Sequence, residues 1–317
     1  MPELPDIEVY CEALRARTMG ARLLGLRLGS PFVLRTVEPR PAELAGRRIV
    51  AVSRLGKRIV FHCAEDLFVV VHLMVAGRFG WYQRGGAEVA LRAKNRLAAF
   101  DFCASPADGE GDEEVTSTLL LTEAGKKRRA SIHLLRGRES LAALDRGGLE
   151  VIGCELGEFE EVLARENHTL KRTLTDPRLF SGIGNAYSDE ILHRARLSPL
   201  RWTSRLDAAQ RRRLWEATRE VLEEATATLR SEVGDGFPKK VTAFRPEMAV
   251  HGKFKQPCPR CAAPVQRIVY AENECNYCAA CQTDGKVLAD RALSRLLRGD
   301  WPRTLQELEE RHEGGPG

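Results

Sequence analysis

The sequence predicts an α+β protein of more than one domain: an N-terminal helix with an antiparallel β-sandwich, then a helical region and a cysteine-rich β-hairpin. Three observations support this prediction. The chain has 317 residues, which is long for a single hydrophobic core. Strand-like segments fill residues 23–136, whereas residues 153–229 have the periodicity of helices. Four cysteines near the C-terminus form two closely spaced pairs.

The first domain is expected to combine one helix with short strands. Residues 4–17 predict a helix, because Ile7, Cys11 and Leu14 share one face at helical spacing. Six segments rich in β-branched and aromatic residues follow, separated by turn residues, as is typical of a sandwich or barrel. They are residues 47–54, 58–63, 66–75, 96–103, 116–122 and 131–136. The acidic stretch 105–114 is expected to be a surface loop.

The helical region ends with a long amphipathic helix at residues 207–229. Asp207 and Gln210 form a pair like a capping box at its start. Apolar residues recur along one face and are expected to enter the core. They are Leu214, Val221, Leu222, Ala225 and Leu229. Residues 231–252, rich in glycine, proline and lysine, are expected to form an irregular connection.

The cysteine spacing predicts a metal site. Cys258-x2-Cys261 and Cys278-x2-Cys281, separated by sixteen residues, have the spacing of a four-cysteine zinc site. Four thiolates leave no position for a water molecule, so we expect one structural Zn²⁺ that folds the hairpin. Cys275 with Cys278 is an alternative pair. That choice shortens the spacer to thirteen residues, so we favour Cys278 and Cys281.

Hydropathy and the N-terminal residues predict a protein that is neither exported nor membrane-spanning. Formal net charge is +5, with positive clusters at residues 126–129, 211–213 and 239–240. Each cluster fits a solvated face as well as contact with a polyanion. The longest apolar run is about half of a membrane span, and the N-terminus does not resemble an export signal. We therefore expect a cytosolic protein with buried, reduced cysteines outside the metal site.

The first residues, MPELPDIEVY, contain a candidate nucleophile. If Met1 is removed, Pro2 presents a secondary amine, and an α-amine with a pKa of ~8 is far less protonated at neutral pH than lysine. Such an amine is a usable nucleophile, and its condensation with an aldehyde carbon gives an iminium ion. Glu3 lies beside it and could move protons. The alternative is that Pro2 and Pro5 merely begin the first helix.

This N-terminus resembles the MPELPEVE start of the formamidopyrimidine-DNA glycosylase and endonuclease VIII (Fpg/Nei) family of bifunctional DNA glycosylases. Further segments resemble that family's lysine-bearing turn, its HLGMSGR segment, its helix–two-turn–helix and its zinc hairpin, in the same order. They are RLGKRIVF (54–61), HLMVAGR (72–78), residues 174–199, and AVHGKFKQPCPRC with CNYCAACQ (249–261 and 275–282). The resemblance covers residues 1–283.

The resemblance implies removal of oxidised bases from double-stranded DNA, followed by strand cleavage at the abasic sugar by β/δ-elimination. Pro2 would attack C1′ and form the iminium ion, and Glu3 would protonate the sugar ring oxygen. Asp6, which stands where the family has glutamate, would assist proton transfer, and Lys57 would hold a phosphate near the lesion. The partner would be duplex DNA with damaged bases or abasic sites, bound by a monomer in the bacterial cytosol.

The resemblance also assigns DNA contacts. Gly184 and Asn185 begin a helix after a GIGN turn, where backbone N–H groups and an amide side chain suit a phosphate. Asn273 stands where many zinc hairpins of the family carry a phosphate-binding arginine. The implied DNA-binding residues are Lys171, Gly184, Asn185, Arg129, Lys253 and Arg267, the last two as candidates to replace that arginine.

Two loops depart from the family pattern. The gap-filling methionine of the family aligns with Val75, while Met74 is shifted by one position, which on a strand reverses the side-chain face. The family's loop with an arginine and a phenylalanine reads GKKRRAS here, so Arg129 remains and Ala130 replaces the aromatic residue. These departures concern the lesion spectrum and DNA docking, and leave Pro2 and its neighbours unchanged.

The sequence therefore predicts four parts. They are a catalytic β-sandwich domain (1–148), a helix–two-turn–helix domain with linker (149–252), a zinc hairpin (253–284) and a C-terminal extension (285–317). The extension is expected to pack onto the hairpin or the helical domain, with docking of a partner as the alternative. Two rival functions stay open: a non-catalytic protein that binds DNA damage, and an RNA-binding relative sharing only the helix–two-turn–helix.

Overall fold

The computed structural model describes residues 1–83, 89–103, 117–125, 127–239, 241, 244–270, 273–289 and 302–313. Its contacts divide the chain into two compact units. Unit 1 comprises residues 1–146 and 225–243, and unit 2 comprises residues 147–224 and 244–317. The sequence-based division keeps residues 149–252 together, whereas the structure groups 225–243 with unit 1. The acidic stretch 105–114 lies outside the described residues.

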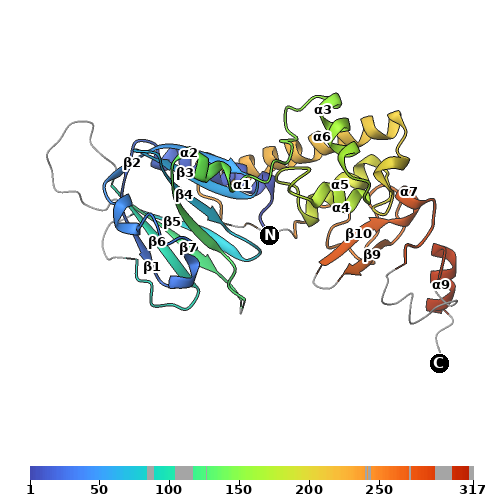
Figure 1. Cartoon of the computed structure of the whole chain (residues 1–317). Helices are drawn as coiled ribbons and strands as arrows, with labels where there is room; N and C mark the ends of the chain where they lie inside the picture. Colours follow the sequence, from blue (N-terminus) through green and yellow to red (C-terminus); the bar gives the residue numbers. More distant parts are fainter. Residues whose placement is uncertain are drawn as a thin grey trace. The chain divides into compact units, whose positions relative to one another are not determined.

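Unit 1 is an antiparallel β-sandwich with a helix at its N-terminus (Figure 1). One layer has the strand order β5-β7-β6-β1 and the other β2-β3-β4-β8, and a short pairing of β1 with β2 joins them. The elements of this unit are α1 (Leu4–Thr18), β1 (Arg22–Leu28), η1 (Pro31–Val33), η2 (Pro41–Leu44), β2 (Arg47–Leu55), β3 (Arg58–Cys63), β4 (Leu67–His72), β5 (Gly77–Gln83), β6 (Arg96–Cys103), β7 (Ser117–Glu123), β8 (Ser131–Arg136) and α2 (Arg138–Ala142).

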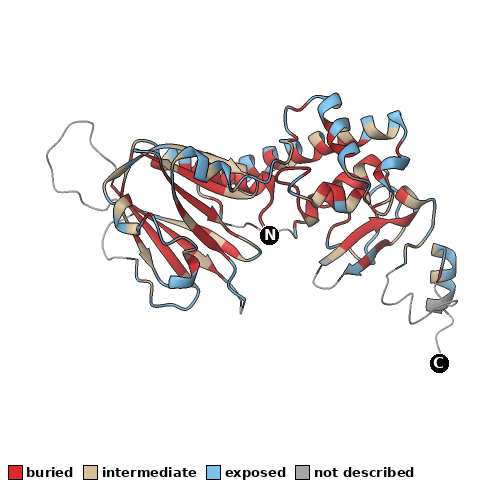
Figure 2. Cartoon of the chain, viewed as in Figure 1, coloured by how far each residue is buried: buried red, intermediate tan, exposed pale blue. Residues whose placement is uncertain are grey.

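The core of unit 1 lies between the two layers and α1. Phe61 of β3 stacks on Phe100 of β6 with ring centroids 6.1 Å apart, so the layers meet through aromatic side chains. Ile7, Cys11 and Leu14 of α1 are fully buried in the same cluster, which confirms the predicted helix face. Figure 2 shows the buried residues concentrated along the strands.

Unit 2 contains short helices, a two-stranded hairpin and the first part of α6. Its elements are α3 (Leu156–Arg165), α4 (Leu170–Thr175), α5 (Asn185–Ala195), η3 (Thr203–Arg205), α6 (Ala208–Val233, shared with unit 1), β9 (Val265–Tyr270), β10 (Asn273–Cys278), α7 (Ala279–Thr283) and α9 (Leu305–Glu313). Asp207 and Gln210 exchange hydrogen bonds at the start of α6, as predicted. Among the helices described, none is both long and apolar enough to cross a bilayer.

The described part of the C-terminal extension packs onto the hairpin. Leu288 and Leu305 contact the buried cluster of Ile268 and Tyr277. The backbone N–H of Leu288 donates to the Tyr277 hydroxyl at 2.7 Å, and Lys286 forms a β-bridge with Thr304. The expectation that the extension packs back onto the hairpin is therefore confirmed at Leu288 and Leu305.

Candidate active site and metal centre

The start of α1 holds the predicted catalytic acids in buried positions. Glu3 is the N-cap, and its backbone N–H donates to the carboxylate of Asp6 at 2.9 Å, which closes a capping box. Pro2, Glu3 and Asp6 are all buried. Asp6 thus stabilises the beginning of the helix. Its predicted part in proton transfer stays a prediction.

The N-terminal amine lies among charges of both signs. In the structure this amine belongs to Met1, and burial lowers its pKa below the ordinary value. The negative charge of Glu3 opposes that shift, whereas the positive charges of Arg78 and Lys57 reinforce it. A lowered pKa increases the fraction of free base, which is the form that attacks a carbon centre.

Lys57 lies on the two-residue turn between β2 and β3. Gly56 precedes it with φ of +60°, a left-handed conformation that suits glycine at the first position of a hairpin turn. Arg54 donates from Nη1 to the Gly56 carbonyl at 2.9 Å and from Nε to Glu8 of α1 at 2.8 Å. The turn that carries Lys57 is therefore attached to the helix that begins at the N-terminal amine.

The segment after β4 is a turn, so the expectation of a strand as far as residue 75 is wrong. β4 ends at His72, and the backbone N–H of Gly77 donates to the Leu73 carbonyl at 2.9 Å. Met74 has φ of +54°, and its sulfur lies 2.5 Å from Nδ1 of His72. Val75 is 58% exposed. Because this segment is a turn, side chains do not alternate between two faces as they do in a strand. Of Met74 and Val75, Val75 is the exposed residue.

The loop between β7 and β8 is organised by a buried carboxylate. Glu123 accepts hydrogen bonds from the backbone N–H groups of Arg129 and Ala130, each at 2.9 Å. Arg129 is exposed and free to reach a ligand in solution. Ala130 is only 2% exposed and belongs to the core cluster of unit 1. The residue that replaces the family's phenylalanine therefore points into the fold.

In unit 2, one face of α5 carries polar side chains that hold the cysteine-rich segment. Asn185 donates from Nδ2 to a backbone carbonyl of β10 at 2.7 Å, and Asp189 accepts from a backbone N–H of β10 at 3.0 Å. His193 Nε2 lies 3.3 Å from Cys258 Sγ. Sequence reasoning missed Asp189 and His193. The available signal was their position four and eight residues after Asn185, which places all three on one face of a helix.

Lys171 is directed into unit 2. Its ammonium donates to the Asn185 carbonyl at 2.6 Å, Ser188 Oγ at 2.8 Å and Asp189 Oδ1 at 2.5 Å. An ammonium group has three donors, and all three have acceptors within the protein. Gly184 is the N-cap of α5. The structure thus brings Lys171, Gly184 and Asn185 together, and a phosphate contact by Lys171 requires exchange of one of these bonds.

The two candidate hairpin cations lie at the surface of unit 2. Lys253 donates from Nζ to the Pro246 carbonyl at 3.1 Å. The Arg267 guanidinium lies 4.3 Å from the ring centroid of Phe254 and 3.4 Å from the Glu274 carboxylate. The Phe254 ring and the Glu274 carboxylate thus hold the Arg267 guanidinium in place. A phosphate contact by Lys253 or Arg267 stays a prediction.

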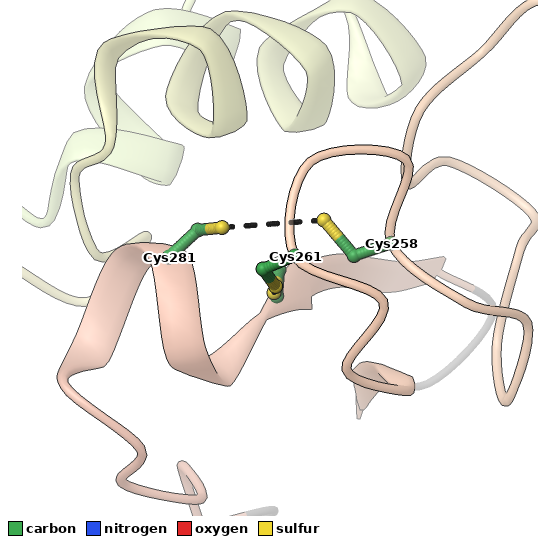
Figure 3. A group of neighbouring side chains, drawn as sticks. Cys258, Cys261 and Cys281 are labelled. Atoms are coloured by element: carbon green, nitrogen blue, oxygen red, sulfur yellow. Dashed lines mark hydrogen bonds between the residues drawn. The ribbon is translucent and has the colours of Figure 1, made fainter.

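The four predicted cysteines converge. The sulfur atoms of Cys258, Cys261, Cys278 and Cys281 all lie within 4.8 Å of one another and could hold a metal ion (Figure 3). The Cys258–Cys281 and Cys261–Cys278 separations are 4.0 and 3.4 Å. Cys275 lies outside this group, and burial raises the pKa of its thiol. The converging sulfur atoms are those of the favoured pair, Cys278 and Cys281, rather than that of Cys275, and zinc binding by them stays a prediction.

Comparison with known proteins identifies similar sequences over most of the chain. Residues 1–115 match the family model of the formamidopyrimidine-DNA glycosylase N-terminal domain, and residues 153–235 match that of its H2TH domain. A formamidopyrimidine-DNA glycosylase of Thermus thermophilus is 32% identical over 292 residues, which cover 90% of this chain and 100% of the relative. A formamidopyrimidine-DNA glycosylase-like protein of Mycobacterium tuberculosis is 38% identical over 48% of this chain and 94% of its own length.

Solved structures with the same fold include complexes of the Lactococcus lactis Fpg. A variant bound to DNA containing Fapy-dG has a TM-score of 0.74 at 24% identity, covering 89% of this chain and 100% of that one. A complex with DNA containing an abasic site has a TM-score of 0.73 at 23% identity, covering 89% and 99%. These similarities confirm the predicted architecture, from the N-terminal helix and sandwich to the helical region and hairpin.

Proposed function

Because the chain belongs to the formamidopyrimidine-DNA glycosylase family, we propose that it excises oxidised bases from duplex DNA and then cleaves the strand at the abasic site. The relatives support the glycosylase activity. The observation that carries the lyase proposal is the start of α1, where Pro2 lies buried beside the carboxylic acids Glu3 and Asp6. Pro2 is the proposed nucleophile once Met1 is removed.

The proposed reaction begins with the free secondary amine. Its lone pair forms a bond to C1′ of the damaged nucleotide, and the bond from C1′ to the base breaks, so the base leaves with that electron pair. The nitrogen then gives its proton to the departing base, and its lone pair forms the iminium ion as the C1′–O4′ bond breaks and leaves its electron pair on O4′. Glu3 donates the proton that O4′ acquires. An acid placed in this way contributes typically 10²–10⁴-fold to rate, on the order of several kcal/mol.

Strand cleavage follows from the charge of the iminium ion. A secondary amine cannot form a neutral imine, so the adduct stays positively charged and acidifies the C2′ proton. Removal of that proton sends electrons toward the nitrogen, and the 3′-phosphate leaves. A second elimination releases the 5′-phosphate in the same way: a further proton is removed, and electrons again move toward the positively charged nitrogen. Asp6 and Lys57 are the proposed proton-transfer and phosphate-holding groups during these steps.

The proposed DNA contacts use both units. Arg129 is exposed in unit 1. In unit 2 the start of α5, at Gly184 and Asn185, offers backbone N–H groups to a phosphate, with Lys171, Lys253 and Arg267 as further candidates. A single Zn²⁺ fits the four cysteines: a Zn–S bond of about 2.3 Å places tetrahedral sulfurs about 3.8 Å apart, between the two separations observed. The ion would hold the hairpin folded.

Borohydride trapping tests this proposal. The zinc-loaded protein is incubated with an abasic duplex and reducing agent, and the covalent protein–DNA adduct is quantified. We expect an adduct whose peptide map places the bond at Pro2, and we expect Pro2→Gly to reduce it strongly. Mass spectrometry of the competent protein should show that Met1 is absent. Efficient strand cleavage by protein that retains Met1 would overturn the proposal.

A non-catalytic damage-binding protein is the second candidate. It is favoured by the buried Ala130 and by the turn at Val75, since these positions differ from the gap-filling residues of the family. Such a protein would bind the abasic duplex tightly and yield no adduct. The same trapping experiment, combined with a binding isotherm, therefore distinguishes the two.

A further inference from the structure

We propose that Arg54 is a positioning residue for the reaction, which sets the place of the Lys57 turn relative to the helix that begins at the amine. This inference rests on the proposed function. Arg54 is not itself a group that touches DNA in this account. It acts through Lys57.

The contacts of Arg54 join helix α1 to the turn between β2 and β3, two elements that lie far apart in the sequence. Its side chain is 10% exposed, with Nε 2.8 Å from Glu8 Oε1 and Nη1 2.9 Å from the Gly56 carbonyl. One planar guanidinium therefore binds a carboxylate of α1 and the backbone of the turn at the same time. Lysine at this position does not reproduce the geometry, because its one ammonium nitrogen cannot occupy the separate positions that Nε and Nη1 of the guanidinium occupy.

Two further hydrogen bonds fix α1 along β2. Cys11 Sγ donates to the Ser53 carbonyl at 3.4 Å, and Arg15 Nε donates to the Val52 carbonyl at 2.7 Å. Together with Glu8 these residues follow the i, i+3, i+7 spacing of one helix face. Of the three contacts, that of Glu8 with Arg54 lies closest to the N-terminus, about 6 Å along the helix from its first residue, Leu4, at ~1.5 Å per residue.

In this arrangement the contacts of Arg54 set the position of the turn that carries Lys57, the proposed phosphate-holding residue, relative to the start of α1, where the proposed nucleophile Pro2 lies. The other two contacts fix the helix against the strand, and they end before the turn. The Arg54 guanidinium continues the connection into the backbone next to Lys57, through the Gly56 carbonyl. A displacement of about 1 Å at a reacting centre can reduce a rate by about 10²-fold, so even a small shift of the turn should be visible in the kinetics.

The test compares four zinc-loaded variants with the parent. Arg54→Lys keeps the positive charge and loses the bridge. Lys57→Ala removes the group that the bridge is proposed to position. The double variant, Arg54→Lys with Lys57→Ala, completes a double-mutant cycle. Glu12→Gln is the matched control, since Glu12 lies on the same helix and pairs with Arg230 at 2.6 Å, away from the turn. Each protein is assayed for melting temperature, affinity for the abasic duplex and trapping rate at saturating protein.

We expect Arg54→Lys to lower the saturating trapping rate about tenfold with little change in melting temperature or affinity. In the Lys57→Ala background the same substitution should change the rate by less than about twofold, because residues acting as a unit are not additive. Glu12→Gln should match the parent. Should Arg54→Lys fail to fold, Glu8→Gln tests the same contact.

The inference would be overturned if Arg54→Lys trapped the abasic duplex at the rate of the parent. It would also be overturned if Arg54→Lys reduced the trapping rate by the same factor in the parent and in the Lys57→Ala background. A loss of rate shared by Glu12→Gln would also overturn it, because the effect would then belong to the helix as a whole. If the parent protein itself gives no adduct, the proposed function has failed and the positioning role fails with it. The two failures are therefore distinguishable.

Discussion

The ammonium of Lys171 lies 2.5 Å from the carboxylate of Asp189, with the two side chains 13% and 0% exposed. The second oxygen of Asp189 accepts hydrogen bonds from His251 Nδ1 at 2.8 Å and from the backbone N–H of Asn276 at 3.0 Å. One buried carboxylate thus connects α4, α5, the turn at residue 251 and β10. Because α5 begins at Asn185, this network also fixes the predicted phosphate site.

Asp189→Asn should destabilise unit 2. The amide keeps an oxygen acceptor but leaves the buried ammonium of Lys171 without a compensating charge, which costs about 3–5 kcal/mol when a buried pair is broken. Denaturant unfolding of the zinc-loaded protein measures the loss. Affinity for an abasic duplex should fall in parallel. The matched control is Glu220→Gln, whose side chain is 55% exposed beside Arg194 and should cost about 0–1 kcal/mol. Equal losses in the two variants would contradict the network.

Cys278→Ser should release the metal and weaken DNA binding. A four-thiolate site contributes about 10–16 kcal/mol of metal binding, which is enough to fold a short hairpin. Zinc content measured by atomic emission should drop toward zero, with the α1 site of unit 1 left intact. Cys275→Ser is the matched control, since Cys275 lies three residues before Cys278 on the same strand, β10, and outside the sulfur cluster. Loss of zinc from the Cys275 variant would refute the assignment.

Periodicity and spacing predicted those parts of the molecule whose signal is local. Ile7, Cys11 and Leu14 were recognisable because a buried helix face repeats within a few residues. The cysteine pairs were recognisable because two knuckles of a metal site have fixed spacing. In both cases the structure agrees, as the core cluster and the four converging sulfurs show.

The long-range polar contacts were not predictable from sequence. Arg54 pairs with a glutamate 46 residues away, and Asp189 binds a backbone group 87 residues away. The chain has 49 basic and 44 acidic residues, and pattern alone does not tell which of them meet. Likewise, the sequence shows that Ala130 replaces an aromatic residue, but its burial depends on the Glu123 carboxylate that anchors the loop.

Ala130→Phe should fail to restore a gap-filling aromatic residue. The position is buried in the unit 1 core, so a larger side chain overpacks it and costs about 1–3 kcal/mol. A lowered melting temperature without faster base excision is the expected result. Arg129→Ala is the comparison at the neighbouring exposed position and should leave the melting temperature unchanged while weakening DNA binding. A stable Ala130→Phe protein with faster excision would contradict the orientation of this loop.

The pH dependence of trapping should report the charges around the amine. Burial and the cations Arg78 and Lys57 lower the pKa of the Met1 amine below its ordinary value of 8.0. We expect the Pro2 amine, one residue along the chain, to meet the same charges once Met1 is removed, so the trapping rate should reach its plateau at a lower pH than for an exposed α-amine. Lys57→Ala removes a positive charge that disfavours protonation, so its midpoint should move to higher pH. Glu3→Gln removes a negative charge, so its midpoint should move to lower pH.

The pH midpoint and the plateau rate report different effects: the midpoint reports the charges around the amine, and the plateau rate reports proton donation. Glu3→Gln should also lower the plateau rate about 10²–10⁴-fold, because the proposed proton donor to the ring oxygen is lost. The measurement is the single-turnover trapping rate from pH 5 to pH 9 at constant ionic strength, since exposed charges are screened by salt. Glu12→Gln is the control and should keep the parental midpoint. Midpoints that move in the same direction for Lys57→Ala and Glu3→Gln would show that the amine does not lie between these two charges.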